Sequence, residues 1–418
     1  MNQAVLNTDD DAYLGQQVVA SVPHINIRAF CDDQRTVQAI QTAAADRRMS
    51  RAHLQIHMGG IAAAVQTFQS ELTPNVILVE TVANRDLILS ELTQLAQVCG
   101  PDTKVIVIGH LNDVLLYREV MRLGVSEYLV APVHQLQIIE SIATLFHDPA
   151  AKPLGRIFAF VGSKGGVGSS TLAHNVGWYL SRQLDTDTVI TDFDLAFGTA
   201  GLNFNQETSQ GIADALGQPD RIDQTLLDRL LTKCGDKLSL LASPGTIDRD
   251  VHIEASSVET ILNTVRHSVP CVIVDVPNMW APWIKHTLLH ADEVVITATP
   301  ELASLRNTKN LVDLLKQARP NDRPPRLVMN QVGIPKRPEI PVADFAKAIN
   351  LDPALTIAYD AQTFGAAASN GQMLAEVSAK AKSAEAVAIL AQILLGKERP
   401  SKPSRFSLPF AGKLLRKK

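Results

Sequence analysis

Residues 160–171 read Phe-Val-Gly-Ser-Lys-Gly-Gly-Val-Gly-Ser-Ser-Thr, and the local fold can be inferred from this stretch. An apolar run comes directly before it, and an amphipathic segment, 171–184, follows. A strand, a glycine loop and a helix in this order are typical of a phosphate-binding loop. Gly165, Gly166 and Gly168 let successive backbone N–H groups turn toward one anion, and the helix N-terminus adds a favourable dipole. The sequence therefore predicts an anion site at the end of a strand in an α/β sheet.

The loop lacks one charge that such loops usually carry. In the general pattern, the last glycine is followed by lysine and then by serine or threonine. Here Gly168 is followed by Ser169 and Ser170, and the only lysine is Lys164, near the start of the loop. A lysine in the later position neutralises phosphate charge in the transition state, and losing such a group costs on the order of a few kcal/mol. We therefore expect nucleotide binding with slow hydrolysis.

Polar side chains at three further strand ends complete the predicted site. Asp192 and Asp194 follow one apolar run, Asp275 follows a second, and Asn330 follows a third. Open α/β sheets bind ligands at the carboxyl ends of their strands. One carboxylate of the pair can hold Mg²⁺ and the other can orient an attacking water, while Asp275 is typical of a Walker B strand and Asn330 suits the adenine edge. A tight turn, a helix cap and an amide that holds a turn are the structural alternatives, but the order of the motifs favours a nucleotide site.

Two tryptophans follow the Asp275 turn. Pro277 and Pro282 flank this segment and oppose a buried helix, so we expect Trp280 and Trp283 to be exposed in a switch region or a dimer contact. Burial in the core is the alternative interpretation.

Apolar runs alternate with helical patterns along most of the chain, which predicts βαβ units around parallel sheets. Continuous apolar runs in the second part are typical of strands covered on both faces. In the first part we expect strands at 25–30, 53–58, 76–79, 104–109 and 127–130, and helices at 36–45, 85–98, 113–123 and 135–146. In the second part we expect strands at 157–161, 188–191, 238–241, 271–274, 293–298 and 327–329, and helices at 171–184, 224–233, 258–267, 305–316 and 383–395.

The first block resembles the receiver domain of two-component response regulators. The segment 124–132, Gly-Val-Ser-Glu-Tyr-Leu-Val-Ala-Pro, is similar to the one that precedes the last helix in that family. The resemblance implies a flavodoxin-like α/β fold for this block.

The phosphotransfer residues of receivers are replaced in this block. Glu80 stands at the position of the phosphoacceptor aspartate, Gly109 at that of the serine or threonine, and Ala131 at that of the lysine. Of the expected set, the acidic pair Asp32 and Asp33 remains. Because this chemistry is missing, we expect a docking module that is not phosphorylated.

The second block resembles the ParA/MinD group of deviant Walker ATPases from about residue 156 to residue 396, which implies a P-loop NTPase-type parallel sheet. Within that group, a receiver-like first domain and a loop ending in Gly-x-Ser-Thr are similar to CpaE/TadZ, the localisation ATPases of Flp (tight adherence) pilus assembly. The matching segments are 164–168 (Lys-Gly-Gly-Val-Gly), 291–301 (Ala-Asp-Glu-Val-Val-Ile-Thr-Ala-Thr-Pro-Glu), 304–306 (Ser-Leu-Arg), Gly198 and 370–374 (Asn-Gly-Gln-Met-Leu).

This second resemblance implies ATP and Mg²⁺ as cofactors and assigns a role to individual positions. Lys164 would contact the nucleotide and, in a homodimer bridged by ATP, the partner's phosphates, while Asp194 would position water. Ser170, Asp192 and Asp275 would serve Mg²⁺. The remaining nucleotide contacts would come from Gly165, Gly166, Val167, Gly168, Ser169, Ser170, Thr171 and Asn330, with Thr171 at the α-phosphate and Asn330 at the base.

Length, charge and cysteine usage limit the class of protein. The chain has 418 residues, which suggests two or three domains. We expect a flexible segment 1–21, a receiver-like domain 22–147, a linker 148–155, an ATPase domain 156–396 and a basic tail 397–418. The sequence has no membrane-spanning apolar run and no secretion signal, and its four cysteines are scattered, so a cytoplasmic location fits best.

Charge is distributed unevenly. The segment after residue 396 holds eight of the 39 basic residues and one of the 43 acidic ones, which leaves 31 basic and 42 acidic residues in the preceding part. An acidic body opposes non-specific nucleic-acid binding. The tail mixes apolar and basic residues, so it is either a contact with the inner membrane surface or a solubilising end.

These features favour a slow ATPase switch that acts as a localisation and assembly factor of a Flp pilus or a type II/IV secretion-like machine. Its receiver-like domain would dock an assembly protein or a polar landmark, at the membrane or the cell pole. The alternatives are a MinD-like septum-site positioning ATPase, a ParA-like partition ATPase and, least supported, a metabolic phosphoryl-transfer enzyme.

Overall fold

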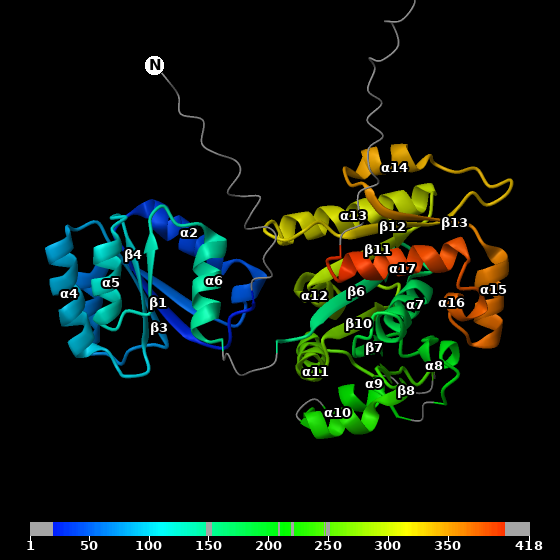
Figure 1. Ribbon diagram of the computed structural model, residues 1–418, viewed down its shortest axis with the longest axis horizontal. Coiled ribbons are helices and arrows are strands. Elements are labelled where there is room, and N and C mark those ends of the chain that lie inside the picture. The colour runs from blue at the N-terminus through cyan, green and yellow to red at the C-terminus, as the bar shows by residue number, and fades with distance from the viewer. Residues whose placement is uncertain are drawn as a thin grey trace, which may run out of the picture. The chain divides into compact units, whose positions relative to one another are not determined.

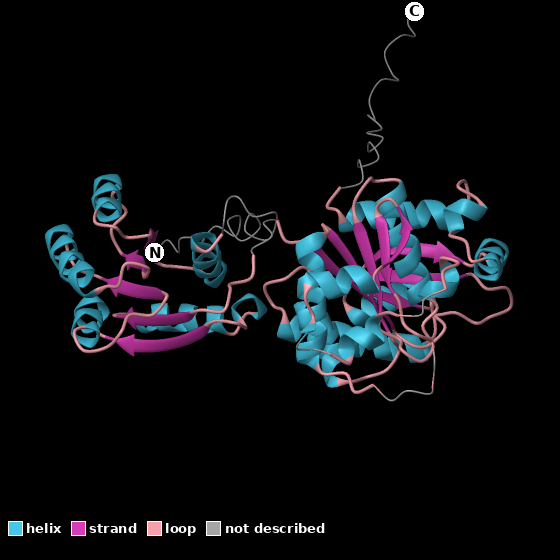
Figure 2. Cartoon of the chain, turned by 90° about the horizontal axis from the view of Figure 1, so that it is seen from below, coloured by secondary structure: helices cyan, strands magenta, loops and turns pink. Residues whose placement is uncertain are grey.

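The computed structural model describes residues 20–147, 153–207, 210–218, 221–245, 247 and 251–397. The chain forms two compact units, Met1–Lys152 with Leu315–Arg323 and Pro153–Leu314 with Pro324–Lys418. Both are α/β structures (Figures 1 and 2). The expected basic tail lies almost wholly outside the described residues, as does the expected N-terminal segment. Among the described helices, none is both long and apolar enough to cross a membrane.

The first unit is built around a five-stranded parallel sheet in the order β2-β1-β3-β4-β5. This is the flavodoxin-like order of a doubly wound sheet. The helices α2 and α6 cover one face, and α3, α4 and α5 cover the other. The elements are β1 (Asn26–Cys31), α2 (Gln34–Ala44), a 3₁₀ turn (Arg47–Met49), β2 (His53–Met58), α3 (Gly60–Phe68), β3 (Val76–Thr81), α4 (Arg85–Val98), β4 (Lys104–Gly109), α5 (Val114–Arg122), β5 (Glu127–Val130) and α6 (Gln135–Leu145).

The second unit is built around an eight-stranded sheet in the order β13-β12-β11-β6-β10-β7-β9-β8, parallel except for the edge strand β8. The elements are β6 (Arg156–Gly162), α7 (Ser169–Arg182), β7 (Thr188–Asp192), α8 (Ala200–Asn203), α9 (Ile212–Leu216), α10 (Gln224–Leu230), β8 (Thr232–Gly235), β9 (Leu238–Leu241), α11 (Ala255–Ser268), β10 (Cys271–Val276), α12 (Pro282–His290), β11 (Glu293–Ala298), α13 (Leu302–Ala318), β12 (Arg326–Val332), α14 (Val342–Ile349), β13 (Pro353–Ala358), α15 (Ala361–Asn370), α16 (Leu374–Val377) and α17 (Lys382–Leu394).

The central strand β6 places the glycine loop at the ligand-binding edge of this sheet. Its Phe158 and Phe160 are fully buried beneath α7 and α17, which lie side by side in Figure 1. The strands β10 and β11 are consecutive along the chain, yet they pair with β6 on opposite sides. Such a reversal of strand order opens a crevice at the carboxyl ends of the strands. The loop after β6 therefore lies where this type of fold binds ligands.

The predicted elements are largely confirmed, with three differences of physical interest. The helix expected at 224–233 ends at Leu230, and Thr232–Gly235 pairs antiparallel with β9, because a short polar edge strand has no apolar run to reveal it. Helix α3 was not predicted, since its start at two glycines with positive φ hides the helical pattern. The strand β13 was also missed, because it begins at Pro353 and alternates buried and exposed residues.

Candidate nucleotide-binding site

The glycine loop adopts a conformation that requires glycine at two positions. Gly166 has φ +78° and Gly168 has φ +89°, in the left-handed region that other residues adopt only with strain. A Cβ atom at Gly168 would also lie 2.6 Å from Asn330 Nδ2. At Gly165, by contrast, a Cβ would meet no atom within 4 Å. The loop is therefore shaped by backbone conformation and by the close approach of β12.

Two side chains at the end of β12 hold the loop. Asn330 Nδ2 donates to the Val167 carbonyl at 2.8 Å, and Gln331 Nε2 donates to the Gly166 carbonyl at 2.8 Å. In a planar trans peptide the next N–H points opposite to the carbonyl, so the N–H groups of Val167 and Gly168 point away from these two side chains. The sequence assigned Asn330 to the adenine edge; the structure places it against the loop, although it also lines the cavity described next.

A cavity of about 480 Å³ lies over the loop. Every predicted nucleotide contact lines it, as do Lys164 and Asp194, whereas Asp192 and Asp275 do not. Several lining residues were not expected from the sequence, and most of them lie at the end of β10, β12 or β13 or directly after β10 or β13, whose carboxyl ends meet at this edge. These residues are Gly162, Val276, Pro277, Asn278, Gln331, Ala358, Tyr359, Asp360, Ala361 and Phe364.

Lys164 is held by an acidic side chain that the sequence did not single out. Its Nζ lies 3.4 Å from Glu301 Oε2, and Glu301 also pairs with Arg337 at 3.3 Å. The Lys164 side chain is 34% exposed, so this ion pair is solvated and can exchange its partner at small cost.

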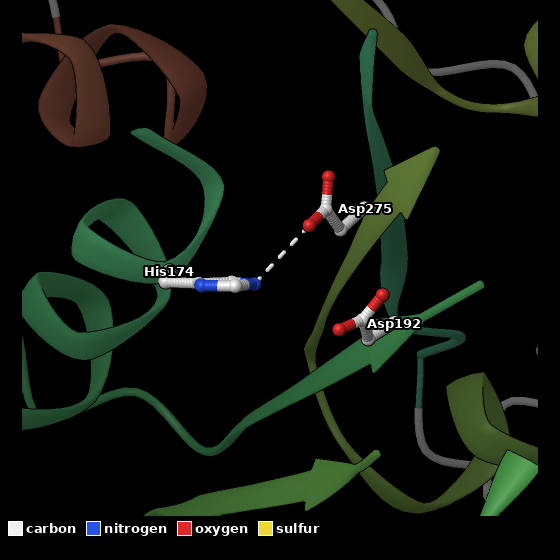
Figure 3. A group of neighbouring side chains, drawn as sticks. All are labelled: His174, Asp192 and Asp275. Atoms are coloured by element: carbon white, nitrogen blue, oxygen red, sulfur yellow. Dashed lines mark ion pairs between the residues drawn. The ribbon is translucent and has the colours of Figure 1, made fainter. Parts of the chain in front are cut away.

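Behind the loop, the two remaining predicted carboxylates meet a buried histidine (Figure 3). Asp275 accepts a hydrogen bond from Ser170 Oγ at 3.2 Å, and its other oxygen lies 3.2 Å from His174 Nε2. Asp192 accepts the backbone N–H groups of Asp194 at 3.0 Å and Ala200 at 3.1 Å. Burial and the charge of Asp275 raise the pKa of Asp192 to about 6. All three side chains belong to a water-excluded layer under the cavity.

His174 is a functional candidate that sequence reasoning missed. Its side chain is fully buried on α7, one turn after Ser170. Burial alone would lower the pKa of His174, but the contact with Asp275 and the charge of Asp192 raise it overall. The available signal was a polar residue inside the apolar stripe of a predicted helix, which periodicity alone interprets as core.

The residues present fit a nucleotide phosphate and Mg²⁺. Ser169 lines the cavity, and its buried Oγ has no hydrogen-bond partner within the described part of the chain. A free hydroxyl beside a glycine loop and a helix N-terminus suits a phosphate oxygen. The Ser170 hydroxyl and the carboxylates of Asp192 and Asp275 are the hard oxygen donors that Mg²⁺ prefers.

The two tryptophans behave differently from each other. Trp280 is 57% exposed, as expected, but Trp283 is 4% exposed and its ring lies 5.6 Å from that of Phe193 at an interplanar angle of 37°, so the expectation for Trp283 was wrong. Pro282 occupies the first turn of α12, where its missing N–H costs no helical hydrogen bond. The proline therefore begins a packed helix instead of preventing one.

In the first unit, the position of the receiver's phosphoacceptor is occupied by a buried, fully engaged carboxylate. Glu80 accepts the backbone N–H groups of Asp32 and Asp33, each at 2.8 Å, and the hydroxyl of Thr36 at 2.6 Å. Burial alone would raise the pKa of Glu80, but these hydrogen bonds lower it.

The second missing receiver position is blocked sterically. A Cβ at Gly109 would lie 2.0 Å from Tyr128 Oη, so no hydroxyl side chain fits there without moving the tyrosine. Together with the engaged Glu80 carboxylate, this packing gives neither position the side chain that a receiver uses there.

Comparisons with known proteins find similarity over parts of the chain. No family model matches it. The structure of the pilus assembly protein CpaE from Caulobacter crescentus is 48% identical, covering 31% of this chain and 98% of that chain, with a TM-score of 0.30. The structure of a ParA family ATPase from Chlorobium tepidum is 28% identical, covering 56% of this chain and 98% of that chain, with a TM-score of 0.52.

A curated relative matches over a shorter span. The septum site-determining protein MinD of Helicobacter pylori is 26% identical over 161 residues, which are 38% of this chain and 58% of that protein. This chain therefore spans less than two thirds of the length of that relative.

Proposed function

Because the chain belongs to the CpaE-type family of pilus assembly proteins and its second unit has the ParA/MinD ATPase fold, we propose that it is an ATP-controlled assembly and localisation factor. The observation that supports this proposal best is the glycine loop itself. It is held in shape by β12, opens on the 480 Å³ cavity and presents an unpartnered Ser169 hydroxyl. A binding loop that is formed before its ligand arrives loses little entropy on binding.

The residues of the site divide into phosphate, cation and water contacts. The loop N–H groups and Ser169 bind phosphate oxygens, and Ser170 with Asp275 and Asp192 hold Mg²⁺, which neutralises phosphate charge when bound. Asp194 lines the cavity and orients the attacking water. Ser169 supplies a hydroxyl but no charge where charge builds in the transition state, so hydrolysis is slow and the protein acts as a switch.

Lys164 links nucleotide binding to assembly of two copies. In the single chain it pairs with Glu301. We propose that in an ATP-bridged homodimer Lys164 leaves Glu301 and binds the phosphates of the partner. The exchange is feasible because the ion pair is solvated and therefore weak.

The first unit would dock a pilus or secretion assembly protein or a polar landmark, without being phosphorylated itself. The basis is the buried Glu80 network and the blocked Gly109 position. Docking would take place at the cytoplasmic side of the cell envelope, with the basic tail as a candidate contact to the inner membrane.

Calorimetric titration of the full chain with ATP and ADP, with and without Mg²⁺, tests the site, and sedimentation with a non-hydrolysable ATP analogue tests the dimer. Lys164→Ala should abolish ATP-dependent dimerisation and weaken ATP binding. Lys309→Ala is the matched control, because it removes another exposed, ion-paired lysine of the same unit. Unchanged dimerisation and affinity in Lys164→Ala would show that our role for this lysine is wrong.

A MinD-like positioning ATPase and a ParA-like partition ATPase remain the alternative functions, because the curated relatives include both kinds of protein. The acidic body opposes partition on DNA. An ATP-dependent shift of DNA in a gel would favour the partition function, and a pilus secretion ATPase and a prepilin encoded nearby would favour the pilus function.

A further inference from the structure

A polar chain with a buried middle runs from the glycine loop to the short helix α8. It begins at Ser170, whose hydroxyl donates to Asp275, and continues from the other Asp275 oxygen to His174 Nε2. It ends at Asn203, the last residue of α8, whose Nδ2 lies 2.8 Å from His174 Nδ1. Figure 3 shows the middle of this chain, with the imidazole of α7 directed at the carboxylate of β10.

The two ring nitrogens of His174 face two different groups. Nδ1 lies 2.8 Å from Asn203 Nδ2, an amide nitrogen that only donates. Nε2 lies 3.2 Å from Asp275, although not in the line of an ideal hydrogen bond. The ring therefore connects a donor on α8 with an acceptor at the metal-binding position.

Helix α8 is attached to the site at both ends. Its first residue, Ala200, donates its N–H to Asp192, and its last residue is tied to His174. A four-residue helix does not persist alone, so these attachments, together with its packing against α7 and α15, hold it in place. Its outer surface carries two exposed apolar side chains, Phe197 just before it and Leu202 within it, which are 75% and 74% exposed.

A polar side chain at position 174 is not what packing requires. Leu172, Ala173 and Val176 of the same helix belong to the fully buried core, and the His174 side chain is buried as completely. Burying an imidazole there costs free energy that an aliphatic side chain would not cost. The contacts with Asp275 and Asn203 are what the histidine adds.

We propose that His174 is a positioning residue that couples the phosphate and metal site to α8, so that α8 and its apolar surface respond to the bound nucleotide. This inference rests on the proposed nucleotide site. A cation held by Ser170 and Asp275 would compete with their mutual hydrogen bond, so the Asp275 carboxylate would reorient. The change reaches Asn203 through His174, because the ring contacts both groups.

A metal ion held by His174, Asp192 and Asp275 themselves is the competing interpretation, since their ligand atoms lie within 4.8 Å of one another. The hydrogen bonds that these carboxylates already accept favour the coupling role. Elemental analysis of the purified full chain distinguishes the two: zinc or manganese bound in a 1:1 ratio in wild type and lost in His174→Leu would overturn the coupling proposal.

The direct test is amide hydrogen exchange of residues 197–206 in the full chain, with and without Mg²⁺ and a non-hydrolysable ATP analogue. In wild type we expect exchange in this segment to change by about threefold or more on binding. His174→Leu and Asn203→Leu should both remove this change while binding of the analogue persists, and the double variant should show no further loss. Ser181→Ala, another buried polar position of α7, should behave as wild type.

Failure of the coupling can be separated from failure of the nucleotide site. If wild type does not bind the analogue, the proposed function is wrong and the coupling falls with it. If wild type binds it and both variants keep the exchange response of 197–206, the coupling alone is wrong. Should His174→Leu fail to fold, Asn203→Leu decides the question, because position 203 is only partly buried.

Discussion

Asn330→Ala tests whether the β12 amide shapes the glycine loop or reads the base. The variant removes one buried hydrogen bond, from Asn330 Nδ2 to the Val167 carbonyl at 2.8 Å. The net loss for such a bond is about 1–2 kcal/mol. For a unit of this size it lowers the midpoint of thermal unfolding by about 2–8 °C. A loop that samples other shapes is competent for binding only part of the time, so affinity should fall, by at most about 5- to 30-fold.

The diagnostic measurement is the ratio of affinities for ATP and GTP, obtained by calorimetric titration of wild type and variant. If Asn330 acts on the loop, both affinities fall by the same factor and the ratio is unchanged. Gln331→Ala is the matched control, because it removes an equally short but exposed hydrogen bond to the Gly166 carbonyl. It should lower the thermal midpoint and the affinity less than Asn330→Ala does. A selective loss of ATP affinity, with unaltered thermal stability, would refute this reasoning and return Asn330 to the adenine edge.

Three further perturbations address the rest of the molecule. Ser169→Lys should raise ATP turnover about 100- to 1,000-fold, since it restores transition-state charge; equal turnover would show that the serine is not what limits hydrolysis. Trp283→Ala should destabilise its unit by about 3–5 kcal/mol in chemical denaturation, whereas Trp280→Ala should stay within about 0.5 kcal/mol. Glu80→Gln should destabilise the first unit by about 1–3 kcal/mol at pH 7, measured by amide exchange of β1 and β3.

The Glu80 prediction also has a pH dependence. The folded-state pKa of Glu80 is lowered from its ordinary value of 4.5, so its ionised form stabilises the fold above pH 4.5. This stabilisation is lost as the pH falls below 4.5 through the folded-state pKa, because the unfolded chain then binds the proton more readily. The difference in the free energy of unfolding between wild type and Glu80→Gln should therefore become smaller as the pH falls below 4.5. A difference that stays constant from pH 7 to pH 3 would argue against an ionised Glu80 in the folded state.

Local pattern was sufficient to predict most strands and the course of the glycine loop. Runs such as Lys104–Gly109 are apolar without interruption, and a strand covered on both faces requires this. At Gly166 and Gly168 the backbone adopts positive φ, which glycine alone tolerates easily, so the residue type by itself predicts the turn. The carboxylates at the strand ends follow from the same logic, since parallel strands bring their carboxyl ends to one edge.

The tertiary structure alone decided what these side chains touch. Asn330 is 163 residues from the carbonyl that it binds, and no periodicity relates the two positions. His174 has the spacing of a core residue, and only the packing of β10 and α8 against α7 brings Asp275 and Asn203 near its two ring nitrogens. Trp283 is buried for a similar reason, because Phe193 comes from a different strand end. Local sequence determines the conformation of each segment, but which groups meet across a sheet depends on the strand order, which is a property of the whole chain.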